Sequence, residues 1–220
     1  MEHIGKVLGN LNLGKITSPQ RSTELLAEDE PIRISSYGVS NLNHTFENFK
    51  PLPGTKEAYE AFKALAEGIG KPFLLCYGGV GNGKTHLLEA LALGLRMRGI
   101  VSRIWVVPDF LAYLRQMLRE SKEDVDVVIE RYQSGGVVLF DDFGMEYGTD
   151  WEMSVMERII NGRYRSRSIT VLVTNKDLDK LPVRIVSRFF DPEIGVVSWN
   201  QGKDYRRRGE VDDKGEKEIK

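Results

Sequence analysis

The stretch YGGVGNGKTHLLEAL at residues 77–91 decides the fold. Within it, residues 78–85 match G-x-x-x-x-G-K-[ST], which forms a phosphate-binding loop when a strand precedes it and a helix follows it. Glycines permit backbone torsions that side chains forbid, so several N–H groups can point at one anion. The helix that follows adds the positive end of its dipole. The stretch therefore predicts a nucleotide site.

Apolar runs and helical segments alternate on both sides of this loop. FLLCY at 73–77 indicates a buried strand, and residues 85–99 have helical spacing up to a glycine. Continuous apolar strands separated by helices predict a parallel sheet covered on both faces, hence an α/β fold. We expect strands at 73–77, 100–107, 137–141, 169–174 and 194–199, and helices at 57–66, 85–99, 109–120 behind an Asp109 cap, and 151–164.

Length and composition indicate a globular protein with short appendages. The 220 residues suit one domain, and a net charge of −1 restricts any DNA-binding surface to a local patch. Cys76 is the single cysteine, so neither an intrachain disulfide nor a cysteine zinc site can form, and we expect a buried strand residue. Without a signal-peptide core or a membrane span, we expect a cytoplasmic location and no membrane contact.

Changes in residue composition along the chain predict three parts. Residues 1–44 are rich in Asn, Ser, Gly and charge, which predicts an N-terminal tail or a small partner-binding segment. The alternating pattern extends over residues 45–208, which we expect to form the ATPase domain. Residues 209–220 form a charged C-terminal tail.

The phosphate loop predicts ATP or ADP, with Mg²⁺, as its ligands. Lys84 would supply a point charge for the β and γ phosphates, and the Thr85 hydroxyl would bind Mg²⁺. His86 comes directly after the motif, and we expect it in the first turn of the helix. The residues expected to contact the nucleotide are Gly78, Gly79, Val80, Gly81, Asn82, Gly83, Lys84, Thr85 and His86.

The run VVLFDD ends a strand with two carboxylates, Asp141 and Asp142. An acidic strand end is the usual partner of a phosphate loop. Asp141 would bind Mg²⁺, and Asp142 would polarise the attacking water or, alternatively, only cap the following turn. Because Asp is one methylene shorter than the Glu found in many such ATPases, we expect slow hydrolysis.

Two further polar positions come after the strand at 169–174. Asn175 lies at its tip, where it would orient the lytic water, although it could also cap a helix. Arg184 and Arg188 are spaced to share one helix face. We expect Arg188 to reach the γ-phosphate on a neighbouring subunit as an arginine finger. The alternative is a helix that carries surface salt bridges.

Taken together, GGVGNGKT, VVLFDDFG, VLVTN and RIVSRFFD resemble the AAA+ ATPases of the bacterial replicative-helicase loaders DnaC and DnaI and the transposition helper IstB. The resemblance covers residues 44–208 and includes FENFKP, RIINGRYRSRSITVLVTN and GKDYR. It implies an AAA+ (ASCE) P-loop NTPase core with a five-stranded parallel sheet of order 5-1-4-3-2 and helices on both faces. It also implies that Arg206 is a second sensor of the nucleotide.

The sequence departs from these relatives at both ends. It cannot build the Cys-rich zinc module of DnaI-like loaders, and its first 44 residues are short for a helicase-binding domain. About twenty residues follow the last expected strand, too few for a full helical lid or for the DNA-binding domain of a DnaA initiator. We therefore expect a loader or a transposition helper rather than an initiator.

Two groups of basic residues are candidates for DNA contact. The resemblance assigns single-stranded DNA to the segment at 109–133, whose charge is mixed. A denser cluster lies between the acidic strand and the next strand. A solvated face is the alternative for both groups. The candidates are Arg115, Arg119, Arg163, Arg165 and Arg167.

The combined features predict an ATP-hydrolysing helicase loader. It would self-associate into an ATP-bridged oligomer or spiral, bind single-stranded DNA, and deliver or remodel the hexameric replicative helicase. One alternative is an IstB-like helper that acts on duplex DNA with a transposase. The other is a nucleotide-binding adaptor with negligible hydrolysis, which the short Asp142 keeps open.

Overall fold

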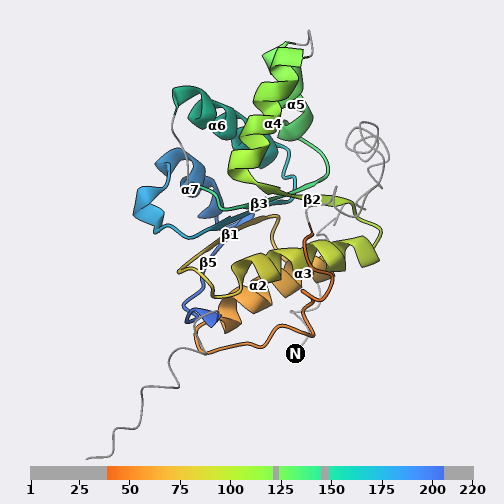
Figure 1. Ribbon diagram of the computed structural model, residues 1–220, viewed down its shortest axis with the longest axis vertical. Coiled ribbons are helices and arrows are strands. Elements are labelled where there is room, and N and C mark those ends of the chain that lie inside the picture. Colours follow the sequence, from red (N-terminus) through yellow and green to blue (C-terminus); the bar gives the residue numbers. More distant parts are fainter. Residues whose placement is uncertain (1–38, 121–123, 145–148, 206–220) are drawn as a thin grey trace, which may run out of the picture.

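The computed structural model describes residues 39–120, 124–144 and 149–205, which form a five-stranded sheet between two layers of helices (Figure 1). The strands are all parallel and lie in the order β2-β3-β4-β1-β5, which confirms the predicted 5-1-4-3-2 sheet read from its other edge. Their bounds are β1 (Phe73–Tyr77), β2 (Ser102–Val106), β3 (Val137–Asp141), β4 (Thr170–Thr174) and β5 (Gly195–Trp199).

Helices cover both faces of the sheet. α2 and α3 pack on one face, and α4, α5, α6 and α7 pack on the other (Figure 1). Within the described residues no α-helix follows β5, and no helix has the length and apolar character needed to cross a membrane. The helices are α2 (Lys56–Glu67), α3 (Lys84–Met97), α4 (Val107–Glu120), α5 (Val125–Gln133), α6 (Asp150–Arg165) and α7 (Val183–Phe189), with a 3-10 turn η2 (Leu178–Lys180).

The side chains of β1 show how one strand supplies two cores. Phe73 and Leu75 point into the core beneath α4 to α7, whereas Leu74 and Cys76 point into the core beneath α2 and α3. This alternation reflects the two-residue period of a strand. The expected burial of Cys76 is confirmed, and burial raises the pKa of its thiol to about 12.

The region after β2 differs from the sequence-based expectation. β2 is shorter than the expected 100–107, and α4 begins at Val107, so Asp109 lies in its first turn instead of capping it. Pro108 is compatible with this start because the first turn of a helix does not use its N–H groups. Asp124 caps α5, where its carboxylate accepts from the backbone N–H of Asp126.

Arg163 is the largest correction to the predicted DNA-contacting cluster. Its side chain is 1% exposed, and its guanidinium group makes five hydrogen bonds of 2.7–3.1 Å. Burial lowers the pKa of Arg163 to about 9, so the group still carries its charge at neutral pH. The acceptors are the Thr170 hydroxyl and the backbone carbonyls of Tyr132, Gly135, Gly136 and Ile169.

The position of Arg163 on α6 explains this burial. It lies three and four residues after Ile160 and Ile159, on the stripe that faces the core. Its hydrogen bonds join α6 to the start of β4 and to the turn after α5. Arg163 is therefore a structural residue that is enclosed by the fold rather than available to DNA.

We predict that Arg163→Leu lowers the free energy of unfolding by about 3 kcal/mol or more, because five buried or partly buried acceptors lose their donor. Arg165→Ala is the matched control, since Arg165 lies on the same helix and is exposed. It should change the free energy by no more than about 0.5 kcal/mol. Urea denaturation followed by circular dichroism measures both; equal effects would contradict the structural role.

Candidate functional site

The parallel register of the sheet brings the predicted polar residues to one edge. Tyr77 at the end of β1 pairs with Thr174 at the end of β4, and Asp141 ends β3 on the other side of β4. The phosphate loop, the acidic pair and Asn175 therefore leave the sheet at its carboxyl edge. This is the edge at which open parallel sheets bind ligands.

The phosphate loop connects β1 directly to α3. Gly83 is the residue before the helix and has φ +89°, a left-handed torsion that favours glycine. A Cβ at this position would also lie 2.7 Å from the Phe49 ring. Residues 78–85 thus form a glycine-rich turn at a helix start, which is a geometry that suits an anion.

Lys84 points back into this loop. Its Nζ donates to the carbonyl oxygens of Gly78 at 2.9 Å and Gly79 at 2.5 Å, and to Asn82 Oδ1 at 2.8 Å. The residue is 4% exposed, and burial lowers the pKa of its ammonium group. The loop thus holds a desolvated cation, which favours the binding of an anion.

Thr85 and Asp141 meet beside the loop. The Thr85 hydroxyl donates to Asp141 Oδ2 at 2.8 Å, and the backbone N–H of Asp142 donates to Asp141 Oδ1 at 2.9 Å. Burial raises the pKa of Asp141, and these two hydrogen bonds oppose that shift. A hydroxyl and a carboxylate oxygen at this separation fit Mg²⁺, which takes few protein ligands and shares its shell with water and phosphate oxygens.

Asp142 adopts an unusual backbone conformation. Its φ is +53°, a left-handed torsion that is uncommon outside glycine and recurs at functional sites. Asn175 Nδ2 donates to Asp142 Oδ1 at 2.9 Å, so the side chain after β4 directly contacts the second acid. The structure therefore brings Asp142 and Asn175 together, whereas their roles stay predictions.

These residues line one cavity of about 640 Å³. Its second wall comes from the segment before α2, to which the sequence reasoning assigned no site role. The sequence FENFKP includes part of this wall, but it served only as evidence for the family resemblance. The wall residues are Ser40, Asn43, His44, Asn48, Phe49, Lys50, Leu52 and Thr55, and Tyr205 lines the cavity from the other end of the chain.

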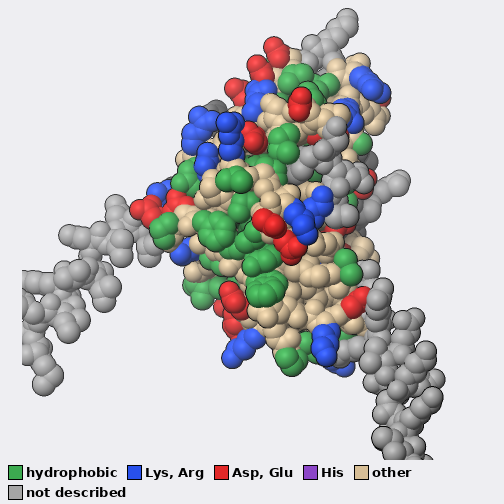
Figure 2. All heavy atoms as spheres, turned by 90° about the vertical axis from the view of Figure 1, so that its left-hand side faces the viewer, with side chains coloured by type: hydrophobic (Ala, Val, Ile, Leu, Met, Phe, Trp, Pro, Cys, Tyr) green, Lys and Arg blue, Asp and Glu red, His purple; other side chains and the backbone are tan. Residues whose placement is uncertain are grey.

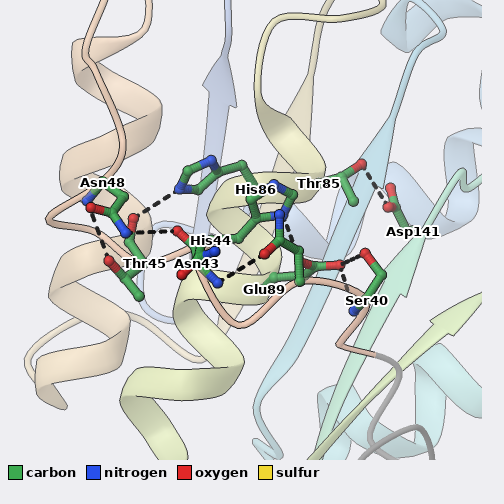
Figure 3. A network of polar contacts seen from close by, with 10 residues as sticks. Ser40, Asn43, His44, Thr45, Asn48, Thr85, His86, Glu89 and Asp141 are labelled. Atoms are coloured by element: carbon green, nitrogen blue, oxygen red, sulfur yellow. Dashed lines mark hydrogen bonds and ion pairs between the residues drawn. The ribbon is translucent and has the colours of Figure 1, made fainter.

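A polar network anchors this second wall to α3 (Figure 3). Glu89 is 2% exposed, and it accepts from Ser40 N at 3.0 Å and from Ser40 Oγ at 2.6 Å. Its other oxygen lies 2.6 Å from His44 Nδ1. Residues 39–44, assigned to the N-terminal segment in the sequence analysis, thus pack on the core.

His86 completes the network from the first turn of α3, where the sequence placed it. Its ring stacks on His44 with centroids 4.4 Å apart, and its Nε2 donates to the Thr45 carbonyl at 2.8 Å. Burial lowers the pKa of His86, which favours the neutral ring. His86 therefore lines the cavity and also orients the wall segment.

The two arginines of α7 lie outside this cavity. Arg188 is half-buried: its Nε donates to Asn161 Oδ1 at 3.1 Å, and its guanidinium carbon lies 5.3 Å from the centre of the Tyr164 ring. Arg184 is 81% exposed at its side chain and lies 3.7 Å from a carboxylate oxygen of Glu157. Arg206 lies outside the described residues.

The remaining candidates for DNA contact differ in exposure. Arg119 and Arg165 are exposed, and Arg167 forms a surface ion pair with Glu193 at 3.0 Å. Arg115 lies 2.8 Å from Glu152 and 5.2 Å from the Trp151 ring, so it also serves to join α4 to α6.

We predict that Glu89→Ala lowers the free energy of unfolding by about 2 kcal/mol, because the partly buried hydrogen bonds that its carboxylate makes with Ser40 and His44 are lost. Limited proteolysis should cut the wall segment at residues 39–50 faster than in the wild type. Glu67→Ala, at the exposed end of α2, is the control and should change neither result. Unaltered proteolysis in Glu89→Ala would contradict the anchoring role.

Known proteins share both the sequence and the fold. A family model described as the bacterial DnaA ATPase domain matches residues 40–195. The chromosomal replication initiator DnaA of Deinococcus radiodurans is 31% identical over an alignment of 174 residues, which covers 76% of this chain and 36% of that protein. The chain thus spans little more than a third of the length of this relative.

Two solved structures show how far the fold is shared. A replication initiator DnaA bound to AMPPCP and single-stranded DNA has a TM-score of 0.64 and 27% identity, covering 74% of this chain and 51% of that chain. The DnaC helicase loader has a TM-score of 0.62 and 20% identity, covering 73% and 98%. The expected likeness to the loaders is therefore one of fold, and the AAA+ fold is confirmed. The family match shows that the chain belongs to the bacterial DnaA ATPase-domain family.

Proposed function

We propose that this chain is an ATPase of DNA replication initiation, which binds ATP with Mg²⁺ and assembles on single-stranded DNA. One observation carries the proposal: Lys84, the Thr85–Asp141 pair and the Asp142–Asn175 pair line the same cavity. A phosphate-binding turn, a magnesium pair and a water-orienting pair are the parts that phosphoryl transfer requires. The AMPPCP bound to a DnaA relative supports the same ligand class.

The geometry supports hydrolysis at the γ-phosphate. Water attacks the γ-phosphorus, the bond to the bridging β,γ oxygen breaks, and Asp142 takes the proton of the water. Lys84 and the loop N–H groups stabilise the charge on the phosphate oxygens. The products are ADP and inorganic phosphate.

The contacts of Asp142 support slow turnover. Its side chain is one methylene shorter than that of Glu, and one of its carboxylate oxygens already accepts a hydrogen bond from Asn175. The left-handed torsion further restricts where the carboxylate can move. Such a site suits a protein that assembles when ATP is bound and disassembles after ATP is hydrolysed.

The surface around Arg188 supports self-association. α7 lies on the left side of the molecule in Figure 1, and Figure 2 shows hydrophobic side chains gathered on that side near Lys and Arg side chains. Val183 and Phe190, at the two ends of α7, are 79% and 58% exposed. We place Arg188 at the junction with the nucleotide of a neighbouring subunit, as an arginine finger.

The partner defines the finer role. The likeness to DnaC supports a loader that delivers or remodels a hexameric helicase, and the DnaA family match supports an initiator-type assembly as the second candidate. A stable complex with the replicative helicase in AMPPCP favours the loader, and ATP-dependent filaments on DNA without helicase favour the initiator type. A complex only with a transposase and duplex DNA would favour the transposition-helper alternative.

Several exposed cations are available for single-stranded DNA. The relative that binds such DNA supports this partner for the present chain. Arg119, Arg165 and Arg167 present their charges to solvent, whereas Arg163 does not. Phosphate contacts from a few such side chains give binding that weakens with salt.

We predict that Lys84→Ala raises the Kd for ATP by at least about 100-fold, because the loop loses the side-chain cation that it holds for the phosphates. Lys180→Ala is the control, since Lys180 is exposed and pairs with Asp177 away from the cavity. Isothermal titration calorimetry measures both. Wild-type affinity in Lys84→Ala would refute the phosphate-loop assignment.

We predict that Arg188→Ala leaves ATP affinity within about twofold of the wild type and lowers both hydrolysis and ATP-dependent assembly at least about tenfold. Arg184→Ala, on the same helix and more exposed, should behave as the wild type. Light scattering with AMPPCP and a phosphate-release assay measure the two effects. Unchanged assembly and unchanged hydrolysis in Arg188→Ala would remove its finger role.

A further inference from the structure

A buried pair of asparagines joins the phosphate loop to the chain after β5. Asn82 is 3% exposed and Asn200 is fully buried. Asn82 Nδ2 donates to the Asn200 carbonyl at 2.8 Å, and Asn200 Nδ2 donates to the Asn82 carbonyl at 3.2 Å. The two residues lie 118 positions apart in the sequence, so the exchange is a tertiary lock.

The same Asn82 side chain also contacts the phosphate-loop lysine. Asn82 Oδ1 accepts from Lys84 Nζ at 2.8 Å. A carboxamide has one acceptor end and one donor end. Because the donor end is held by Asn200, the acceptor end faces the ammonium group. The backbone carbonyl of Asn200 therefore fixes, through the Asn82 carboxamide, which atom Lys84 meets inside the loop. The Asn200 carboxamide in turn holds the Asn82 backbone through its carbonyl.

Further bonds fasten the segment at 200–205 along the loop. Asn200 N donates to the Tyr77 carbonyl at 2.8 Å, and Tyr205 N donates to the Gly81 carbonyl at 2.9 Å. Gly202 N donates to Asn200 Oδ1 at 3.1 Å, which fixes the Asn200 side chain itself. Both ends of the Asn200 carboxamide are thus occupied in one orientation.

The phosphate loop and the segment at 200–205 lie so close together that the loop has no room for side chains at two of its glycines. A Cβ on Gly78 would lie 2.1 Å from the Asn200 carbonyl oxygen, and Gly78 has φ +148°. A Cβ on Gly81 would lie 1.8 Å from a carboxylate oxygen of Asp204. The glycines of the phosphate loop thus serve the fit to residues 200–204 as well as the approach of an anion.

We propose that Asn200 is a positioning residue for the polyphosphate group of the nucleotide. Its carboxamide donates to the Asn82 carbonyl and accepts from Gly202 N, and so fixes the backbone whose carbonyl orients the Asn82 side chain toward Lys84. Its backbone N–H holds the start of the loop at the Tyr77 carbonyl. This inference rests on the proposed nucleotide function and deepens it. Asn200 lies directly after the last strand, and its role in phosphate recognition does not require contact with the nucleotide.

The proposed role concerns the phosphate groups of the ligand and not the wall at residues 40–55. Loss of the asparagine lock should weaken every ligand that uses the loop, including tripolyphosphate, which has no base or sugar. We expect Asn200→Ala and Asn82→Ala each to raise the Kd for tripolyphosphate about tenfold. The double variant should bind no more weakly than the weaker single variant, because the two side chains act in series. Asn200→Ala frees the backbone that orients the Asn82 carboxamide, and Asn82→Ala removes that carboxamide itself.

The experiment is a double-mutant cycle on the full chain. Isothermal titration calorimetry with ATP and with tripolyphosphate would give the four Kd values, and thermal denaturation without ligand would report folding. Gln201→Ala is the matched control: its exposed side chain comes directly after Asn200, and its hydrogen bond to Gly54 uses only backbone atoms. It should bind both ligands as the wild type does.

The outcomes are distinct. Wild-type affinity for tripolyphosphate in Asn200→Ala would overturn the positioning role. A Kd increase in the double variant equal to the product of the two single increases would overturn it as well. Absence of binding by the wild type to ATP as well as tripolyphosphate would refute the proposed function instead. If Asn200→Ala does not fold, Asn82→Leu removes the Asn82 side-chain bonds to the Asn200 carbonyl and to Lys84 at similar volume, and it should show the same tenfold loss.

Discussion

The candidate nucleotide site of this protein depends on the parallel alignment of β1, β3 and β4. Parallel strands end at the same edge of a sheet, so the residues directly after each strand meet at that edge. β4 lies between the other two, which sets the phosphate loop and the acidic pair on either side of Asn175. The Thr85–Asp141 and Asp142–Asn175 contacts result from this register.

Two segments distant in the sequence complete the site that the sheet begins. The wall at residues 40–55 is held by the buried Glu89 on α3, and the segment at 200–205 is held by the Asn82–Asn200 lock. Both Glu89 and Asn82 lie within five residues of Lys84. The fold thus surrounds the loop with buried polar contacts that fix its shape before any ligand arrives, which reduces the cost of ordering it on binding.

Sequence reasoning recovered the features that depend on local pattern. Motifs and strand ends predict the loop, Asp141 and Asn175, and the structure brings these to one cavity. The strand order was implied by the resemblance to AAA+ ATPases, and the sheet has that order. Arg163 was misjudged because it was grouped with its charged neighbours, although its spacing from Ile159 already placed it on the core stripe. Asn200 and Glu89 carry no local signal, since their partners lie far along the chain.

The central claim is that these strand ends form one ATP·Mg²⁺ site in each chain. Calorimetric titration of the wild-type protein with AMPPCP, with and without Mg²⁺, tests it most directly. We expect one nucleotide per chain and tighter binding with Mg²⁺, because the adjacent oxygens of Thr85 and Asp141 would serve as ligands for the ion. No binding, or binding that is indifferent to Mg²⁺, would contradict it.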